Sequence, residues 1–162
     1  MKVPKKRRRE AKTDYKKRIK LLKSGLPRVV FRRTNKYLIA QYVTSEEAQD
    51  KVVFGMDSRV LLKLGWPEKA KFSLKTIPAA YLIGVLMGKE IIKRKLKEPI
   101  VDFGMLRILH KSRVYAFLKG LKDAGIGIKC KEDLFPEEKR LKGEHLKNKI
   151  NIEEIKSKII KG

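Results

Sequence analysis

The stretch RVVFRRTNKYLIAQYV, residues 28–43, decides the fold, because its two apolar arms meet at the polar residues Thr34 and Asn35. Val, Ile, Phe and Tyr favour strands, and Asn tolerates the left-handed backbone that a tight turn needs. The stretch therefore predicts two strands joined at Thr34 and Asn35. Side chains alternate along a strand, so the first arm should present two sets of residues on opposite faces: Arg28, Val30 and Arg32, and Val29, Phe31 and Arg33.

Four cations surround this predicted hairpin, namely Arg28, Arg32, Arg33 and Lys36, and Tyr37 lies beside them. A basic β-surface that carries an aromatic ring can hold phosphates and stack an unpaired base. An ordinary edge hairpin with solvated ends is the alternative interpretation. The hairpin is thus a candidate nucleic-acid contact.

The residues after the hairpin extend the predicted sheet. Residues 51–56 should form a third strand after an acidic loop at residues 45–50, and residues 58–64 a short helix that ends at Gly65. Residues 99–104 are almost continuously apolar, which is typical of a buried strand.

Two longer helices should cover the sheet. The first should begin at Thr76, with Pro78 in its first turn, and run to about residue 95. Small residues recur along it at Ala80, Gly84 and Gly88, which predicts a helix pressed closely onto the sheet. Ser112 should cap the second helix, and Gly125 should follow its end. The predicted buried face of this second helix is Val114, Phe117, Leu118 and Leu121.

Together these elements predict an α/β fold of the mixed α+β kind. A hairpin and a third strand are followed by helix, strand and helix, and the helices cover a mixed sheet. We divide the chain into a basic N-terminal extension with a short helix (residues 1–25), a central α/β domain that carries the candidate nucleic-acid contact (26–125) and a C-terminal extension (126–162). The last segment, residues 151–162, is an amphipathic tail rich in Lys and Ile.

Charge is distributed very unevenly along the 162 residues, whose formal net charge is +24. Residues 1–36 carry sixteen Lys and Arg against two acids, whereas residues 37–74 carry five of each. Self-repulsion of this size does not help a fold, so it indicates a polyanionic partner. Its concentration at one end favours a nucleic-acid-facing surface there.

The N-terminal extension should have two parts. Residues 1–12 offer almost nothing to bury, so alone they should be disordered and should order on a polyanion, unless they are a nuclear-type address or a solubilising tail. Thr13 should then cap a short helix that ends at Gly25. Its apolar stripe, Tyr15, Ile19 and Leu22, should dock on the domain, leaving the lysines and arginines outward.

Several chemical classes lack support in the sequence. Cys130 is the single cysteine, and His110 and His145 lie 35 positions apart without ligand spacing, so we expect neither disulfide nor metal site. We interpret both histidines as solvent-facing or core-edge residues. The triplet Asp102-Phe103-Gly104 matches a kinase metal-binding motif but has none of its companions, so we interpret it as a strand end. We therefore expect no cofactor and no enzymatic activity.

The apolar runs are also informative about membranes. The longest, residues 77–87, is too short to span a bilayer. Behind the basic N-terminus there is no apolar stretch of a signal peptide. We therefore expect a soluble, intracellular protein with no membrane partner.

Four stretches resemble one known family. They are KRRREAKTDY (6–15), NKYLIAQ (35–41), TIPAAYL followed by Gly84 (76–84), and SRVYAFLKG followed by DAG (112–125). Phe135-Pro136 and Gly143-Glu144-His145 continue the similarity in the same order. The chain resembles, over residues 6 to about 146, the large-subunit ribosomal protein family that bears the number eighteen, in its archaeal and eukaryotic-type branch.

The resemblance implies a structural protein that binds 5S rRNA and helps to attach it to 23S rRNA in the central protuberance, beside neighbouring large-subunit ribosomal proteins. Homo-oligomers are not expected. Another basic RNA- or DNA-binding architectural protein is the alternative, and an RNA-modifying enzyme a weaker one. The residues expected to contact RNA come from the basic opening, the hairpin and the Ser112 region: Lys5, Lys6, Arg7, Arg8, Arg9, Lys12, Thr13, Tyr15, Lys16, Arg18, Arg28, Arg32, Arg33, Asn35, Lys36, Tyr37, Gln41, Ser112 and Arg113.

Overall fold

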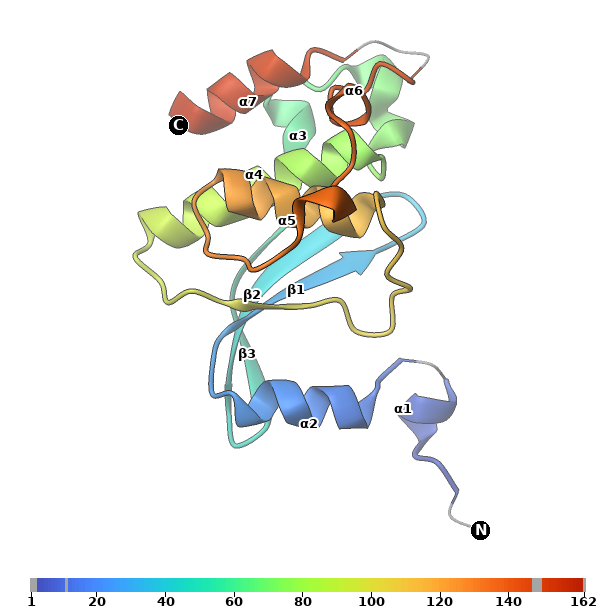
Figure 1. Ribbon diagram of the computed structural model, residues 1–162, viewed down its shortest axis with the longest axis vertical. Coiled ribbons are helices and arrows are strands. Elements are labelled where there is room, and N and C mark those ends of the chain that lie inside the picture. The colour runs from blue at the N-terminus through green and yellow to red at the C-terminus, as the bar shows by residue number, and fades with distance from the viewer. Residues whose placement is uncertain (1–2, 11, 147–149, 162) are drawn as a thin grey trace.

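The computed structural model describes residues 3–10, 12–146 and 150–161. Its elements follow one another from the basic N-terminus to a C-terminal helix (Figure 1). In chain order they are α1 (Lys6–Arg9), α2 (Tyr15–Lys23), β1 (Arg28–Arg33), β2 (Leu38–Glu46), β3 (Gln49–Asp57), α3 (Val60–Lys63), η1 (Glu68–Ser73), α4 (Ile77–Lys93), β4 (Ile100–Asp102), α5 (Arg113–Asp123), η2 (Glu132–Leu134), α6 (Glu138–Leu141) and α7 (Ile152–Lys161).

The four strands form one mixed sheet in the order β3-β2-β1-β4. β1 pairs antiparallel with β2 and parallel with β4, and β2 pairs antiparallel with β3. The predicted α+β class is therefore confirmed. The predicted acidic loop is wrong, because β2 and β3 extend through it to a tight turn at Glu47 and Ala48. Both residues have positive φ, 46° and 66°, as a two-residue hairpin turn with matching twist requires.

The β1–β2 hairpin turns where the sequence predicted. The Thr34 amide donates to the Tyr37 carbonyl oxygen at 2.9 Å, and the Thr34 hydroxyl accepts from the Tyr37 amide at 3.0 Å. These bonds close the loop around Asn35 and Lys36, which are both exposed. The turn therefore projects two polar side chains from a fixed backbone.

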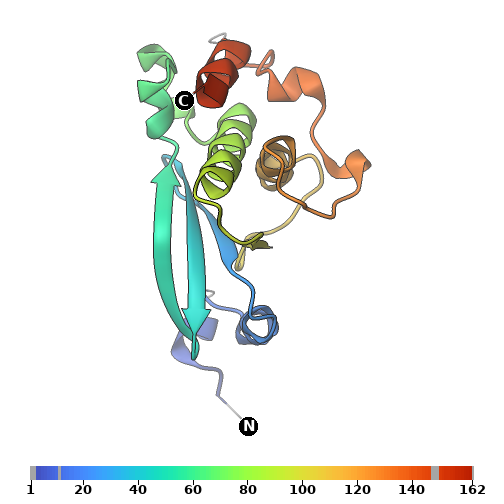
Figure 2. The same ribbon diagram turned by 90° about the vertical axis from the view of Figure 1, so that its left-hand side faces the viewer.

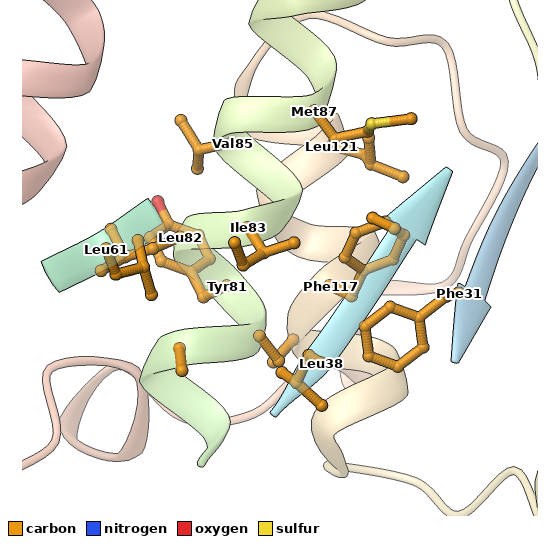
Figure 3. Packing of buried hydrophobic residues seen from close by; sticks show 14 of the residues in the cluster. Phe31, Leu38, Leu61, Tyr81, Leu82, Ile83, Val85, Met87, Phe117 and Leu121 are labelled. Atoms are coloured by element: carbon orange, nitrogen blue, oxygen red, sulfur yellow. The ribbon is translucent and has the colours of Figure 1, made fainter. Parts of the chain in front are cut away.

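Helices α4 and α5 cover one face of the sheet (Figure 2). Phe31 of β1 stacks on Phe117 of α5, with ring centroids 4.5 Å apart, and Leu38 of β2 lies in the same cluster (Figure 3). Val29 and Phe31 are almost fully buried, as the alternation in β1 predicted. The predicted buried residues of α5 are confirmed as well, because Val114, Phe117, Leu118 and Leu121 all join the core: each is at most 8% exposed.

The small residues of α4 face α5 rather than the sheet, so the predicted helix–sheet contact is wrong. A Cβ at Gly84 would overlap the Phe117 carbonyl oxygen and lie 3.1 Å from the Gly120 Cα. Gly120 in turn faces the backbone of Tyr81 and Val85. Two glycines thus let the α4 and α5 backbones touch. The spacing of small residues in α4 predicted a close contact but not that α5 makes it. α5 has a single glycine, Gly120, and therefore no repeated small-residue pattern.

Helix α2 differs from the prediction in its cap and in its docking. Asp14, not Thr13, is the N-cap, and its carboxylate accepts from the Lys16 and Lys17 amides at 3.1 and 3.3 Å. No residue of α2 is fully buried: Tyr15 and Leu22 are half-buried and Ile19 is 53% exposed, so the predicted apolar stripe is only partly covered. Residues 1–12 were expected to be disordered without a polyanion, but residues 6–9 form the single helical turn α1.

The C-terminal helix α7 is amphipathic, as predicted, and packs against α4. Ile152, Ile155 and Ile159 are buried in the common core. Lys156 donates to the Tyr81 hydroxyl at 2.6 Å, and that hydroxyl donates to Asp123 at 2.8 Å. Burial, followed by the Asp123 hydrogen bond, raises the pKa of Tyr81, so this hydroxyl stays protonated and links α4, α5 and α7.

Candidate RNA interface

The N-terminal basic surface, which we define as the cations of residues 5–20, lies at one end of the sheet around α1 and α2 (Figure 1). Most of its cations are exposed: Lys5, Lys6, Arg7, Arg8, Arg9, Lys12, Lys16 and Lys20.

Thr13 and Tyr15 organise this surface. Arg7 donates to the Thr13 hydroxyl at 3.0 Å, and the Lys5 ammonium lies 5.0 Å from the centre of the Tyr15 ring. Arg8 contacts the Asp14 carboxylate at 3.4 Å. Such exposed contacts contribute little to stability, so a polyanion can replace them at small cost.

Arg28 is not part of an exposed interface, which corrects the prediction. Its side chain is 2% exposed and lies between Asp50 and Asp102, at 2.6 and 3.3 Å. Ser45 accepts a further hydrogen bond at 2.9 Å. β1 is an inner strand, and its neighbours bring these acidic and polar groups to the face away from α4 and α5. The alternation of side chains in β1 predicted which face Arg28 lies on, but it could not predict which residues of the other strands lie beside it.

Arg32 and Arg18 also serve internal contacts. Arg32 donates to the carbonyl oxygens of Phe31 and Asp102 at 2.9 and 3.0 Å. Arg18 donates to Asp50 at 2.9 Å and to the Ala48 carbonyl at 3.2 Å, which ties α2 to the β2–β3 turn. Burial alone would raise the pKa of Asp50, but hydrogen bonds from Arg18 and Ser45 and the charges of Arg28 and Arg18 hold it below its ordinary value.

A cavity of about 310 Å³ between α2 and the sheet contains Gln41, with Arg28 and Arg32 along its lining. Asp14, Asp50 and Asp102 line the same cavity, so its positive charge is partly balanced from within the protein. Gln41 is therefore separated from the exposed hairpin turn and lies in this mixed-charge cavity.

The hairpin turn brings together Asn35, Lys36 and Tyr37 with two cations that the sequence did not reveal. The Lys75 ammonium donates to the Asn35 carbonyl at 2.8 Å, and the Arg59 guanidinium lies 4.8 Å from the centre of the Tyr37 ring. Arg59 also pairs with Asp57, and its hydrogen bond is the main cause that lowers the pKa of that carboxyl. One face of Tyr37 is therefore occupied by Arg59. Lys75 and Arg59 are too far from the turn in the sequence for a local pattern to place them there.

Ser112 and Arg113 lie at the start of α5, where Arg33 from the end of β1 joins them around a groove. Ser112 occupies the N-cap position, but its hydroxyl makes no capping hydrogen bond. Burial and then the charge of Arg33 lower the pKa of Arg113. Two arginines that are 80 positions apart in the chain thus face the same space.

Other kinds of site find no support among the described residues. No three His, Cys, Asp or Glu side chains within ranges 3–10, 12–146 and 150–161 come close enough together to hold a metal ion. In the same ranges no helix combines the length and apolar character needed to cross a bilayer.

The excess of exposed cations at one end of the molecule is typical of proteins that bind nucleic acid. The profile of a family described as ribosomal large subunit proteins 60S L5, and 50S L18 matches residues 1–100. The large ribosomal subunit protein uL18 of Korarchaeum cryptofilum (strain OPF8) is 45% identical over 145 residues, which cover 90% of this chain and 72% of that protein.

These matches define a structural constituent of the large ribosomal subunit. The chain belongs to the family of large-subunit ribosomal proteins that includes 60S L5 and 50S L18.

Proposed function

We propose that this protein binds 5S rRNA and helps to attach it to 23S rRNA in the central protuberance, beside neighbouring ribosomal proteins. Its role is structural rather than catalytic. The observation that carries the proposal is the exposure of the N-terminal basic surface, most of whose cations extend into solvent. The resemblance in the basic opening, the hairpin and the Ser112 region supports the choice of 5S rRNA.

The two exposed elements should contribute differently. Exposed lysines and arginines on α1 bind phosphates, which position a protein without reading sequence. Asn35 and Lys36 project from a turn that hydrogen bonds fix to the sheet, and rigid polar groups are suited to recognising RNA shape and unpaired bases. Arg28 is buried, and Arg18 and Arg32 donate to oxygen atoms of the protein, so these three are left out of the proposed direct contacts.

The first prediction is a steep dependence on salt. Binding of 5S rRNA should release counterions from on the order of 6–10 phosphates, so the affinity should fall about 10³–10⁵-fold between roughly 50 and 200 mM salt. Filter binding or fluorescence anisotropy across this range measures the slope. An affinity that does not change with salt would exclude an electrostatic interface.

The second prediction separates the tail from the turn. Deleting residues 1–12 should weaken binding to 5S rRNA and to an unrelated structured RNA by similar factors. Replacing Asn35, Lys36 and Tyr37 with Ala should lower the affinity for 5S rRNA more than that for the competitor. Both RNAs are titrated with each folded variant at one salt concentration.

The opposite pattern would contradict this division. If the deletion removed the preference for 5S rRNA while the triple variant kept it, sequence discrimination would belong to the N-terminal basic surface. Circular dichroism spectra of both variants provide the control for folding.

A further inference from the structure

The outer edge of strand β3 is open. β3 is the last strand in the sheet order, so only β2 pairs with it, and Figure 2 shows it at the margin of the sheet. Alternate backbone amide and carbonyl groups of an edge strand point away from the sheet. Among residues 3–10, 12–146 and 150–161, no backbone group outside the sheet forms a hydrogen bond with the backbone of β3. The strand therefore offers a template for one more strand.

The side chains along this edge are suited to such an addition. Val52 and Val53 are 50% and 40% exposed, and Phe54 beside them is only partly buried. Branched and aromatic side chains stabilise a sheet by packing against those of a neighbouring strand. Proline and lysine commonly protect a free edge from pairing, but β3 has no proline and one lysine, Lys51. The edge is thus poorly protected against an added strand.

The charge beside this edge differs from that of the rest of the molecule. Glu46 and Glu47, at the tip of the β2–β3 hairpin, are exposed, and no cation in the described part of the chain lies within ion-pair distance of either. Asp50, by contrast, is paired with Arg18 and Arg28. The two free carboxylates repel phosphates and attract cationic side chains. In a chain with a formal net charge of +24, they make this edge unsuited to RNA and suited to a basic protein segment.

We propose that the outer edge of β3 binds an extended, lysine- or arginine-containing segment of another large-subunit ribosomal protein, which joins the sheet as an additional strand. Hydrogen bonds between the two backbones provide affinity, Val52, Val53 and Phe54 provide apolar contacts, and Glu46 and Glu47 pair with the cations of the segment. A second copy of this chain is disfavoured, because the net charges of two chains and the glutamates of two facing edges repel. The proposal goes beyond the binding of 5S rRNA and does not depend on it.

The first test identifies the bound segment in assembled large subunits. The full chain carries Ala48→Cys, labelled with a benzophenone, and Cys130→Ser, so that the label has a single position. Ala48 is exposed in the turn next to the edge, so the label leaves β3 itself unchanged. Irradiation should join the label to a basic stretch of another ribosomal protein, which mass spectrometry identifies. A cross-link to rRNA, to a second copy or to an acidic protein segment would overturn the proposal, and so would a label that reacts with no other chain.

The second test measures binding of a synthetic peptide, with the sequence of the cross-linked stretch, to the full chain without RNA. Val53 is the extra residue of a β-bulge opposite Val43, a position where a sheet tolerates proline. Val53→Pro removes an amide from the edge and should weaken peptide binding about 10-fold or more. Val53→Lys leaves the backbone intact and should also weaken it, because it places a charge where the added strand packs. Circular dichroism confirms that each variant is folded.

The charge contribution is tested with a double variant, Glu46→Gln with Glu47→Gln. It should weaken peptide binding about 3–10-fold, because two exposed ion pairs are lost. The matched control, Glu68→Gln with Glu144→Gln, removes the same charge from two exposed glutamates elsewhere and should bind the peptide as wild type does. Equal affinities of the wild type and both Val53 variants, or of the two double variants, would overturn the proposal.

The same variants separate this proposal from that of 5S rRNA binding. All of them should bind 5S rRNA with wild-type affinity, and a loss in the folded Val53→Lys or Val53→Pro protein would assign the edge to RNA instead. A wild-type chain that bound the peptide but not 5S rRNA would overturn the proposed function alone. A wild-type chain that bound 5S rRNA but not the peptide would overturn the assignment of the edge alone.

Discussion

Gly84→Leu should lower the free energy of unfolding by about 1–3 kcal/mol or more, because any side chain at this position overlaps the α5 backbone. The obstacle is the Phe117 carbonyl oxygen, with the Gly120 Cα behind it, so no side-chain rotation relieves the overlap. The two helices must separate, and the Phe31–Phe117 stack beneath them then loses contact. Chemical denaturation of both proteins measures the difference.

A matched pair of variants tests the geometric reason. A Cβ at Gly88 would lie 2.5 Å from the Ala124 Cβ, which is a side-chain obstacle on the same interface. Gly88→Ala should therefore destabilise the protein, and adding Ala124→Gly should recover part of the loss. No neighbouring side chain can be trimmed to rescue Gly84→Leu. A Gly84→Leu protein that unfolds at the same denaturant concentration as wild type would show that α4 and α5 do not touch there.

Arg28→Met should destabilise the protein by about 3 kcal/mol, because it removes the main partner of a nearly buried carboxylate. Asp102 is only 9% exposed and would keep Arg32 at 3.6 Å and the Gly104 amide at 2.7 Å. Removing one member of a buried ion pair is costly because the remaining charge loses its compensation. RNA affinity of the folded variant should stay unchanged, since the Arg28 side chain is 2% exposed.

Arg33→Met is the matched control at the other end of the same strand. Arg33 is exposed, so this variant should change stability by less than about 0.5 kcal/mol and should weaken RNA binding. The two substitutions remove the same charge but should affect different properties. Arg28→Met should lower stability and leave RNA affinity unchanged, whereas Arg33→Met should lower RNA affinity and leave stability nearly unchanged. If a fully folded Arg28→Met protein lost RNA affinity, the result would show that Arg28 contributes to the RNA interface.

Elements with strong local patterns could be predicted from the sequence. The hairpin at residues 28–43 has branched and aromatic arms and a turn that Thr34 closes by its own hydrogen bonds, so its signal is local. The helices α4 and α5 carry apolar periodicity and recognisable starts at Pro78 and Ser112. Local conformation follows from neighbouring residues, which is why these elements were placed correctly.

Side-chain partners that are distant in sequence could not be predicted. Arg28 has the spacing of an exposed cation, yet β3 and β4 bring Asp50 and Asp102 to it. Ile19 belongs to an apolar stripe but stays exposed, and the polar contacts of Arg18 with Asp50 and the Ala48 carbonyl help to hold α2 against the sheet. Strand register and helix placement decide which side chains become neighbours. The hydrophobic pattern of a single element gives no information on either.

The sequence by itself determined the fold class, the excess of charge at the N-terminus and the family resemblance, because composition and local pattern carry all three. Tertiary structure alone decided which cations are available. It buried Arg28, engaged Arg18 and Arg32, and brought Arg33, Arg113 and both histidines to the start of α5. The reason is physical: a charge remains available to bind RNA where folding leaves it exposed and at most weakly paired, and chain-distant packing decides where that is.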